Sequence, residues 1–566
     1  MFTQGQASCL SLYSSTMKTE LGYSQDEVDW LGVAKSASLL FACIIGATQD
    51  KLGSFYSCIS SGLIGILAFT LIYFTLEGDI EISYQSMWWL HFFAYGATTA
   101  MQAPPLLTSM ANFPKHRALT SSLLSSAASL GGAFFSEYDE YADDNTVVLL
   151  CGLLPGFVAF FVWPFMKIIS TNNLTIADKK ATGRTFVYYW CAMAFFILYM
   201  VGIEVWQIFV DFGDVGYLLS LSGYGLIIVA IIAGGMLFWA SALHHEQTKE
   251  SPMQLKQNPE DEGILKPQYD LYDTFSTPRG PSLPGAKTGH WQTSDFPYAR
   301  VLFNVFTDWK YMLLVLASYL NMGNMSVTTD NIQQIAMSVL GIRNVDRITR
   351  YTTSLSTSLA AGRLMGGVVS EEMLKRYQTP RSFVLVMGSG ISCLGVYFLA
   401  ETSSDKLYFG CAMSSFGFGW VGILLSAIIF EQWGEAVYGI VNFFNIFFTN
   451  FLGSVIGSIA LFAEEYNDDA QLDYEGSKYC FGNECFDTTY YVLLGLAITG
   501  TIAYMVFAYA SLDEHAKLLL EPYTELPELP ENRAMINVEG YSSEPSKDGT
   551  VSTNKESPTF EQYARA

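Results

Sequence analysis

Charged side chains are scarce in this chain of 566 residues: they make up 15% of it, against roughly 25% in an ordinary soluble domain. Basic residues are the scarcest, because 30 Lys and Arg stand against 53 Asp and Glu and leave a formal net charge of −23. This balance argues against a nucleic-acid partner, since phosphate binding requires a basic surface. The opening stretch, MFTQGQASCLSLYSS, lacks a basic segment, so we expect no cleavable signal peptide.

The residue arrangements that catalysis requires are also missing. No nucleophile–base pairing and no phosphate-binding loop is evident in the sequence. The one histidine-rich stretch, HHE at 244–246, does not fix a metal geometry, because two adjacent His and one Glu leave the ligand arrangement open. The sequence therefore predicts that the protein is not an enzyme and has no cofactor and no metal site.

Long apolar runs are abundant instead, and a helix needs about 20 such residues to cross a bilayer. The runs lie near residues 1–18, 28–48, 55–76, 86–111, 117–136, 146–168, 185–210, 215–242, 311–339, 351–371, 382–400, 407–430, 436–462 and 488–511. The sequence thus predicts an all-α, polytopic, multi-pass membrane protein with about 14 spans, surrounded by the lipid bilayer. Two polar stretches interrupt the pattern: a linker from 244 to 300, and an acidic, Pro- and Ser-rich tail from 512 to 566 that we expect to be disordered.

Short loops predict the orientation. Basic residues gather on one side of the predicted spans, at Lys51, Lys115, Lys179, Lys180 and Lys375. By the positive-inside rule this side is cytoplasmic, which also places both termini and the linker there. The segment GIRNVDRITR at 341–350 disagrees, since it puts three arginines on the other side. The sequence leaves the plasma membrane and a vacuolar or endolysosomal membrane as alternatives.

Cysteines serve two expected purposes. Seven of the nine lie in predicted spans and are typical small core residues. Cys480 and Cys485, in CFGNEC, fall in a loop on the outer side, where a disulfide is plausible and two unpaired thiols are the alternative.

The stretch GATQDKLG follows the second predicted helix at 46–53. Gly46 permits close approach of a neighbouring helix, Asp50 and Lys51 lie at the water interface, and Gly53 permits the reversal of the chain. The spacing resembles the signature loop of the major facilitator superfamily. That resemblance implies a carboxylate latch between two helical halves on the cytoplasmic side.

A weaker counterpart occurs in the later half of the chain. There Gly367 precedes Glu371 by four residues, with basic residues following, at the same end of the second helix of its own block. Two blocks with the same pattern indicate an internal repeat.

Five stretches resemble the nodulin-like branch of this superfamily, which is similar to monocarboxylate and oxalate carriers. They are LYSSTMKTELGYSQDEVDWLGVAKS (12–36), NFPKHRALTSSLLSSAASLGGAFFSEY (112–138), TTDNIQQIAMSVLG (328–341), GRLMGGVVSE (362–371) and FEQWGEAVYGIVNF (430–443). The resemblance implies a six-helix bundle at 1–170, two additional helices at 184–243, the linker, and a second six-helix bundle at 301–511. The chain departs from the family by carrying Ser125 where the fifth helix of relatives carries a Lys, and the first helix is expected to be truncated.

Three ionisable residues within predicted spans are candidate substrate-binding residues, because a charge at membrane depth is costly and usually faces a cavity. Arg363 has a guanidinium that can hold a carboxylate, a role that the resemblance to monocarboxylate carriers supports, and a structural arginine paired with a neighbouring helix is the alternative. Lys35 lies near the outer end of its helix, where it either binds cargo or reaches the headgroups. Asp330 lies in a Gly-, Asn- and Thr-rich stretch that indicates a locally broken helix. It either carries a proton, neutralises Arg363, or caps the helix.

The function that these features favour is secondary active transport of a small solute by alternating access. The preferred cargo is an organic anion such as a monocarboxylate, with proton coupling. Two alternatives stay open: a non-transporting receptor or scaffold with a carrier fold, and an inactive truncated product.

Overall fold

The structure is a computed structural model. It describes residues 2, 5, 9–113, 117–142, 144–166, 176–209, 214–254, 298–341, 345–401, 404–434, 437–469, 471–472 and 478–512. Most of the expected linker and nearly all of the expected disordered tail lie outside these residues. The side chains of Asp50 and Lys51 lie outside the described part as well, so their expected latch role stays a prediction.

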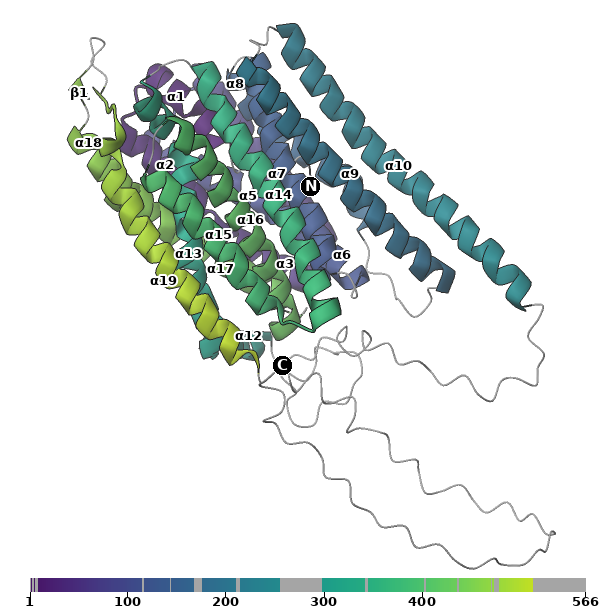
Figure 1. Ribbon diagram of the computed structural model, residues 1–566. Coiled ribbons are helices and arrows are strands. Elements are labelled where there is room, and N and C mark those ends of the chain that lie inside the picture. The colour runs from purple at the N-terminus through teal and green to yellow at the C-terminus, as the bar shows by residue number, and fades with distance from the viewer. Residues whose placement is uncertain are drawn as a thin grey trace, which may run out of the picture. The chain divides into compact units, whose positions relative to one another are not determined.

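The described part is helical almost throughout (Figure 1). Its helices are α1 (Leu10–Glu20), α2 (Gln25–Ala37), α3 (Leu39–Leu52), α4 (Ser54–Leu76), α5 (Tyr84–Ala100), α6 (Ala103–Asn112), α7 (Arg117–Tyr141), α8 (Asp144–Val162), η3 (Trp163–Phe165), α9 (Ile176–Phe209), α10 (Asp214–Gln254), α12 (Tyr298–Thr307), α13 (Trp309–Leu340), α14 (Val345–Tyr377), α15 (Arg381–Ala400), α16 (Ser404–Trp433), α17 (Tyr438–Leu452), η6 (Gly453–Ala463), α18 (Glu464–Asp469), η7 (Asn483–Cys485) and α19 (Asp487–Ala510). Two short antiparallel strands, β1 (Gln471–Leu472) and β2 (Lys478–Tyr479), form the sheet of the described part.

The expected count of about 14 spans is not confirmed. Ten helices of the described residues are long and apolar enough to cross a membrane, or eleven if α12 and α13, which meet at a bend of 66°, form one span. The physical reasons are visible in the remaining runs: α1 has 11 residues, α5 has 17 and α6 has 10, and α14 carries charged residues near both ends. The protein is nevertheless an integral, multi-pass, all-helical membrane protein.

Helix ends follow the local sequence. Ser24 and Glu27 form a reciprocal capping box at the start of α2, in which each side chain accepts a hydrogen bond from the other residue's backbone N–H. α3 ends at Gly53, which has a φ of +87°, a value that favours glycine. The run predicted at 86–111 divides into α5 and α6 just before Pro104 and Pro105, because a proline ring is tolerated in the first turn of a helix and not in its interior.

The expected break near Asp330 was wrong, since α13 runs unbroken from Trp309 to Leu340. The Thr328 hydroxyl donates to Asn324 O (3.2 Å) and the Thr329 hydroxyl donates to Met325 O (2.8 Å), so these two hydroxyls are satisfied within the helix itself. The irregular segment lies instead on the neighbouring element, where α17 continues into η6, a π-helix.

Helices from early and late parts of the chain lie side by side. α7 packs along α14, and α3 packs along α17, while α2 contacts η6 and α1 contacts α13. We call the contact of α7 with α14 and the neighbouring α16 the seam. The helices α9 and α10 pair with each other and contact α7, and α9 also contacts α14, so they cover the seam laterally (Figure 1).

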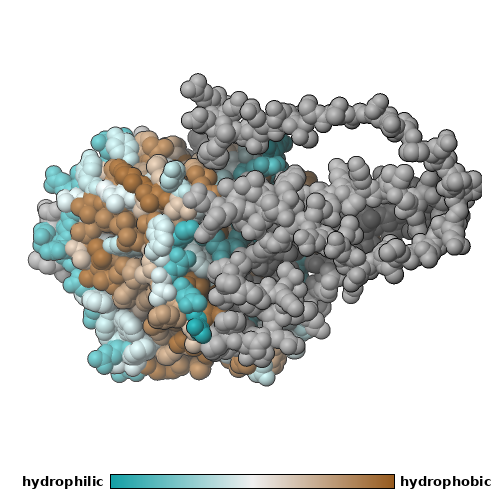
Figure 2. Space-filling model, turned by 90° about the horizontal axis from the view of Figure 1, so that it is seen from below, coloured by the Kyte–Doolittle hydropathy of each residue, from teal (hydrophilic) through white to brown (hydrophobic). Residues whose placement is uncertain are grey.

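Apolar side chains reach the surface over much of the visible described part (Figure 2), as expected for helices that face lipid. The two ends of the helical body are recognisable by sequence. One end carries the disulfide between Cys480 and Cys485, whose Cα atoms are 5.9 Å apart, and we call it the disulfide end. The other carries the last two turns of α3 and Gly53, residues 46–53, and we call it the motif end.

Glycines set the spacing between α14 and α16. A Cβ added at Gly362 would lie 2.0 Å from the carbonyl oxygen of Phe416, which is backbone and cannot move aside. Replacing Gly362 with Val is therefore expected to lower the unfolding temperature in detergent, with a cost of at least the ~1–3 kcal/mol typical of overpacking. Gly390→Val is the matched control, because nothing lies within 4 Å of its added Cβ. Equal melting temperatures for the two variants would contradict this packing.

Candidate functional site

A cavity of about 120 Å³ lies among helices from both parts of the chain. The turn between α5 and α6 contributes Gln102, α7 contributes Ser125, and α14 contributes Arg363. The remaining wall comes from α6, α13, α16 and α17. Its residues are Ala103, Leu106, Met322, Phe418, Gly422, Ile423, Leu425, Ser426, Tyr438, Asn442, Phe443, Asn445, Ile446, Thr449 and Asn450.

Arg363 is the cationic group of this wall. One terminal nitrogen of its guanidinium donates to Ser125 O and to Ser129 Oγ, both at 2.8 Å, so it reaches across the seam to α7. Among the described residues no carboxylate forms a salt bridge with it. A guanidinium at membrane depth that is held only by neutral acceptors leaves the cavity with a net positive charge, which favours an anionic ligand.

An amide-rich stripe lies opposite, on α17. Asn442, Asn445 and Thr449 recur at positions i, i+3 and i+7, so they share one face of the helix. Asn445 Oδ1 and Thr449 Oγ1 are buried and have no hydrogen-bond partner among the described residues. Unsatisfied polar atoms that line a cavity are available to a bound solute, because leaving them unpaired is costly.

Sequence reasoning missed this stripe. The signal was present in NFFNIFFTN, where the only polar residues of an apolar helix repeat on a single face. Asn442 of the stripe and the nearby Asn450 already have partners: Ser426 Oγ donates to Asn442 Oδ1 at 3.2 Å, and Ser326 Oγ donates to Asn450 Oδ1 at 3.0 Å.

Lys35 and Asp330 lie outside the cavity wall, toward the disulfide end, and form an ion pair with each other. The exposed fractions of their side chains are 14% and 5%. The interpretation of Lys35 as a residue that reaches the headgroups was therefore wrong, because its ammonium group is held by a carboxylate inside the protein. Asp330 likewise neutralises Lys35 and not Arg363.

Further polar contacts join early and late helices near this ion pair. Ser14 Oγ donates to Gln333 Oε1 at 3.1 Å, and the hydroxyls of Ser36 and Ser454 lie 2.6 Å apart. Closer to the end, Asn467 Nδ2 donates to Asp26 Oδ1 at 2.8 Å. The disulfide end is thus closed by polar groups, which we call the polar gate.

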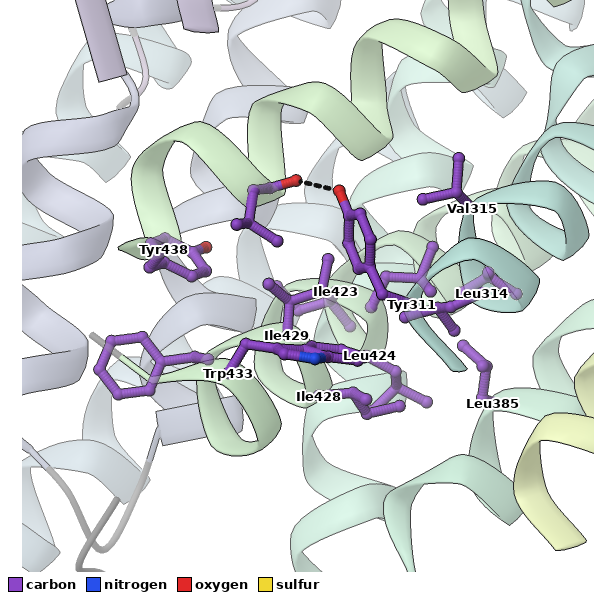
Figure 3. Close-up of a cluster of buried hydrophobic side chains, with 14 of the residues drawn as sticks. Tyr311, Leu314, Val315, Leu385, Ile423, Leu424, Ile428, Ile429, Trp433 and Tyr438 are labelled. Atoms are coloured by element: carbon purple, nitrogen blue, oxygen red, sulfur yellow. Dashed lines mark hydrogen bonds between the residues drawn. The ribbon is translucent and has the colours of Figure 1, made fainter. Parts of the chain in front are cut away.

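The motif end is closed by apolar packing. Figure 3 shows Tyr311 and Trp433 at the centre of a buried cluster, where the Tyr311 hydroxyl donates to Val441 O at 2.8 Å. Trp433 also donates through Nε1 to Asp308 Oδ2 at 3.0 Å. Leu106, Leu107 and Met110 of α6 join this cluster, so it spans both parts of the chain. We call it the apolar gate.

Close helix approaches accompany the apolar gate. A Cβ added at Gly46 would lie 3.1 Å from the backbone of Gly439 on α17, and one added at Gly367 would lie 2.4 Å from Ser122 on α7. Gly46 and Gly367 therefore lie where early and late helices meet. Arg117, at the start of α7, lies over the ring of Phe430 at 4.8 Å from its centroid.

Glu371 belongs to a buried network at this end. Arg381 donates from NH2 to Glu371 Oε1 at 3.1 Å, from Nε to Glu431 Oε1 at 2.9 Å, and from NH1 to Ser370 Oγ at 2.7 Å. The guanidinium joins the ends of α14, α15 and α16. One arginine thus fixes three helix ends of the later part of the chain.

His91 on α5 belongs to the core of the early helices. It is fully buried, its Nδ1 lies 2.9 Å from Met87 O, and its Nε2 lies 3.5 Å from the Tyr13 hydroxyl. Among the described residues no group of three His, Cys, Asp or Glu is placed to hold a metal ion.

Comparison with known proteins finds one matching family model and several similar solved structures. Residues 1–233 match the family model described as Nodulin-like. No curated protein matches the chain in sequence. Similar solved structures include the proton:xylose symporter XylE, with 11% identity, 90% of this chain and 93% of that chain covered, and a TM-score of 0.49. The nucleoside transporter NupG (11%, 89% and 97%, 0.43) and the E. coli fucose:proton symporter FucP (11%, 89% and 97%, 0.42) are also similar. The match over residues 1–233 is to the same nodulin-like family that the sequence motifs of the chain resemble.

Proposed function

We propose that the chain is a secondary active transporter of a small organic anion. The observation that carries this proposal is Arg363, a guanidinium in the wall of a buried cavity with no carboxylate partner among the described residues. A carboxylate cargo would supply the missing charge and accept paired hydrogen bonds from it. The amide stripe on α17 would bind further oxygen atoms of such a solute.

The gates supply the alternating access. Two bundles, 1–170 and 301–511, would rock about the cavity, so that either the polar gate or the apolar gate opens at one time. The polar gate would face the outside and the apolar gate the cytoplasm, in accordance with the basic loops. This orientation places both termini in the cytoplasm.

Transport and its dependence on Arg363 are tested in proteoliposomes. Uptake of a panel of labelled mono- and dicarboxylates is compared with that of neutral hexoses and nucleosides, under an imposed pH gradient. Saturable uptake is expected for a carboxylate. Arg363→Ala is expected to lower that uptake by about tenfold or more, because a charge-assisted hydrogen bond contributes about 1.5–3 kcal/mol.

Arg376→Ala is the matched control for this variant. Arg376 lies on the same helix, but its side chain is 72% exposed and pairs with Glu372 at the surface. Equal uptake by the two variants would contradict a binding role for Arg363. Absence of flux for every solute tested, in folded and correctly inserted protein, would contradict transport itself.

The ion pair of the polar gate is expected to control access from the disulfide end. Removing one partner of a buried pair costs about 3–5 kcal/mol. Lys35→Gln or Asp330→Asn should therefore destabilise the closed gate and expose the cavity on that side. The measurement is the rate at which an impermeant maleimide labels a cysteine at position 445, in protein that lacks its seven free cysteines. A severalfold faster rate is expected from the disulfide side.

Two controls sharpen this test. Lys406→Gln removes an exposed partner of Glu401, 3.6 Å away, and is expected to leave the labelling rate unchanged. Exchanging the two charges, as Lys35→Asp with Asp330→Lys, is expected to return the rate toward that of the unmodified protein. A rate that stays fast in the exchanged protein would refute the ion pair as the gate.

A further inference from the structure

Two buried glutamates lie at the seam, away from the central cavity. Glu137 on α7 is 2% exposed and Glu204 on α9 is 5% exposed. Both lie between one and two turns from the ends of their helices nearest the disulfide end. Neither belongs to the cavity wall or to either gate.

The groups that contact the two carboxylates are neutral. Gln207 Nε2 donates to both oxygens of Glu137 at 3.1 Å, and Ser220 Oγ donates to Glu137 Oε2 at 3.5 Å. The Tyr408 hydroxyl donates to Glu204 Oε2 at 2.6 Å. Glu204 Oε1 is buried and has no hydrogen-bond partner among the described residues.

Positive charge at this place is sparse. Arg350 on α14 lies within electrostatic range of Glu137, and the two carboxylates themselves interact. Neither carboxylate forms a salt bridge with a described residue. Asp330 differs from both, because Lys35 balances its charge directly.

The hydroxyls of two tyrosines near the pair donate to backbone carbonyls and not to the carboxylates. Tyr199 on α9 donates to Ser220 O at 3.1 Å, and Tyr224 on α10 donates to Leu130 O at 2.9 Å. Tyr351 on α14 stacks edge-on against Tyr408, with ring centroids 5.9 Å apart. Two carboxylates in a poorly solvated site with so little compensating charge do not both remain ionised, so the pair is expected to keep a proton.

The same residues connect helices that move in alternating access. Glu204 and Gln207 are one turn apart on α9, yet Glu204 contacts α16 of the later part and Gln207 contacts α7 of the early part. Sliding of α7 against α16 would pull these contacts apart and change how each carboxylate is hydrogen-bonded. The proton affinity of the pair would change with it.

We propose that Glu137 and Glu204 form a proton-binding site, shared between α7 and the additional helix α9, that takes up and releases one proton as the seam moves. The site rests on the proposed transport function, since it names the place where a proton gradient would be coupled to the movement of cargo. The proton enters and leaves through a carboxyl oxygen, and no other bond is made or broken.

Infrared difference spectroscopy of the full chain in nanodiscs tests the site without any cargo. A carbonyl-stretch band of a protonated carboxyl group is expected near neutral pH and should titrate away as the pH rises. Glu137→Gln and Glu204→Gln are each expected to abolish it, because they leave the remaining carboxylate without an acidic neighbour. The exposed Glu401→Gln is expected to leave it unchanged.

Tyr408→Phe keeps both carboxyl groups and supplies a second, milder variant. It removes the hydrogen bond that stabilises ionised Glu204, so the band should persist to higher pH than in the unmodified protein. A band unaffected by both Gln substitutions, or one that responds to sodium and not to pH, would overturn the site.

Proton movement is then measured separately, with a pH-sensitive dye inside proteoliposomes. Cargo-driven proton uptake is expected to be lost in Glu204→Gln. Solute flux that carries protons equally in this variant would overturn the site and leave transport standing. A titrating band in a protein with no flux for any solute would support the site and overturn the transport function.

Discussion

The structure depends on how the guanidinium of Arg363 is held at the seam. Two neutral acceptors, Ser125 O and Ser129 Oγ, both lie on α7, while the arginine itself lies on α14. A cation at membrane depth is costly to bury, by a few kcal/mol on insertion scales, and these hydrogen bonds compensate for only part of that cost. No carboxylate among the described residues forms a salt bridge with this positive charge. The same contact connects α14 to α7, so the residue that we propose to bind cargo also joins a late helix to an early one.

Small residues make this contact possible. The Ser- and Gly-rich stretch of α7 lets α14 approach closely, and Ser126 Oγ donates to Ala360 O at 3.0 Å across the seam. Ser125 and Arg363 line the same cavity, so a lysine at position 125 would add a second cation to that wall. A serine at position 125, in place of the lysine that the resemblance implies, is therefore compatible with the position of Arg363.

Much of the fold could be predicted from the sequence, because the length and apolarity of a segment indicate whether it can form a membrane-spanning helix. Apolar length indicated most of the helices, and Pro104 with Pro105 indicated the break between α5 and α6. These signals failed where a polar segment keeps its helical hydrogen bonds. The polar stretch around Asp330 was interpreted as a broken helix, yet its hydroxyls donate to carbonyls one turn earlier and keep α13 continuous.

The partner of a charged side chain was harder to predict than the helix on which that side chain lies. Arg363 was placed in a cavity wall as expected for a charged residue within a span, whereas the partner of Lys35 is 295 residues away and no local pattern indicates it. The amide stripe on α17 could have been found by its helical period alone. Long-range ion pairs depend on how two halves pack, and a single sequence contains that information only through the fold.

The two additional helices illustrate what an inserted pair can add to such a fold. If α9 and α10 each cross the membrane, the pair returns the chain to the side it left, which is what parallel repeats require. α10 is mostly exposed and faces lipid, since only 17% of its most apolar window is buried. α9 instead places polar side chains against both halves at the seam. A helix fixed to both halves by hydrogen bonds resists their sliding until those bonds are exchanged. A change in the protonation of Glu137 or Glu204 would therefore change how strongly α9 resists the sliding of α7 against α16.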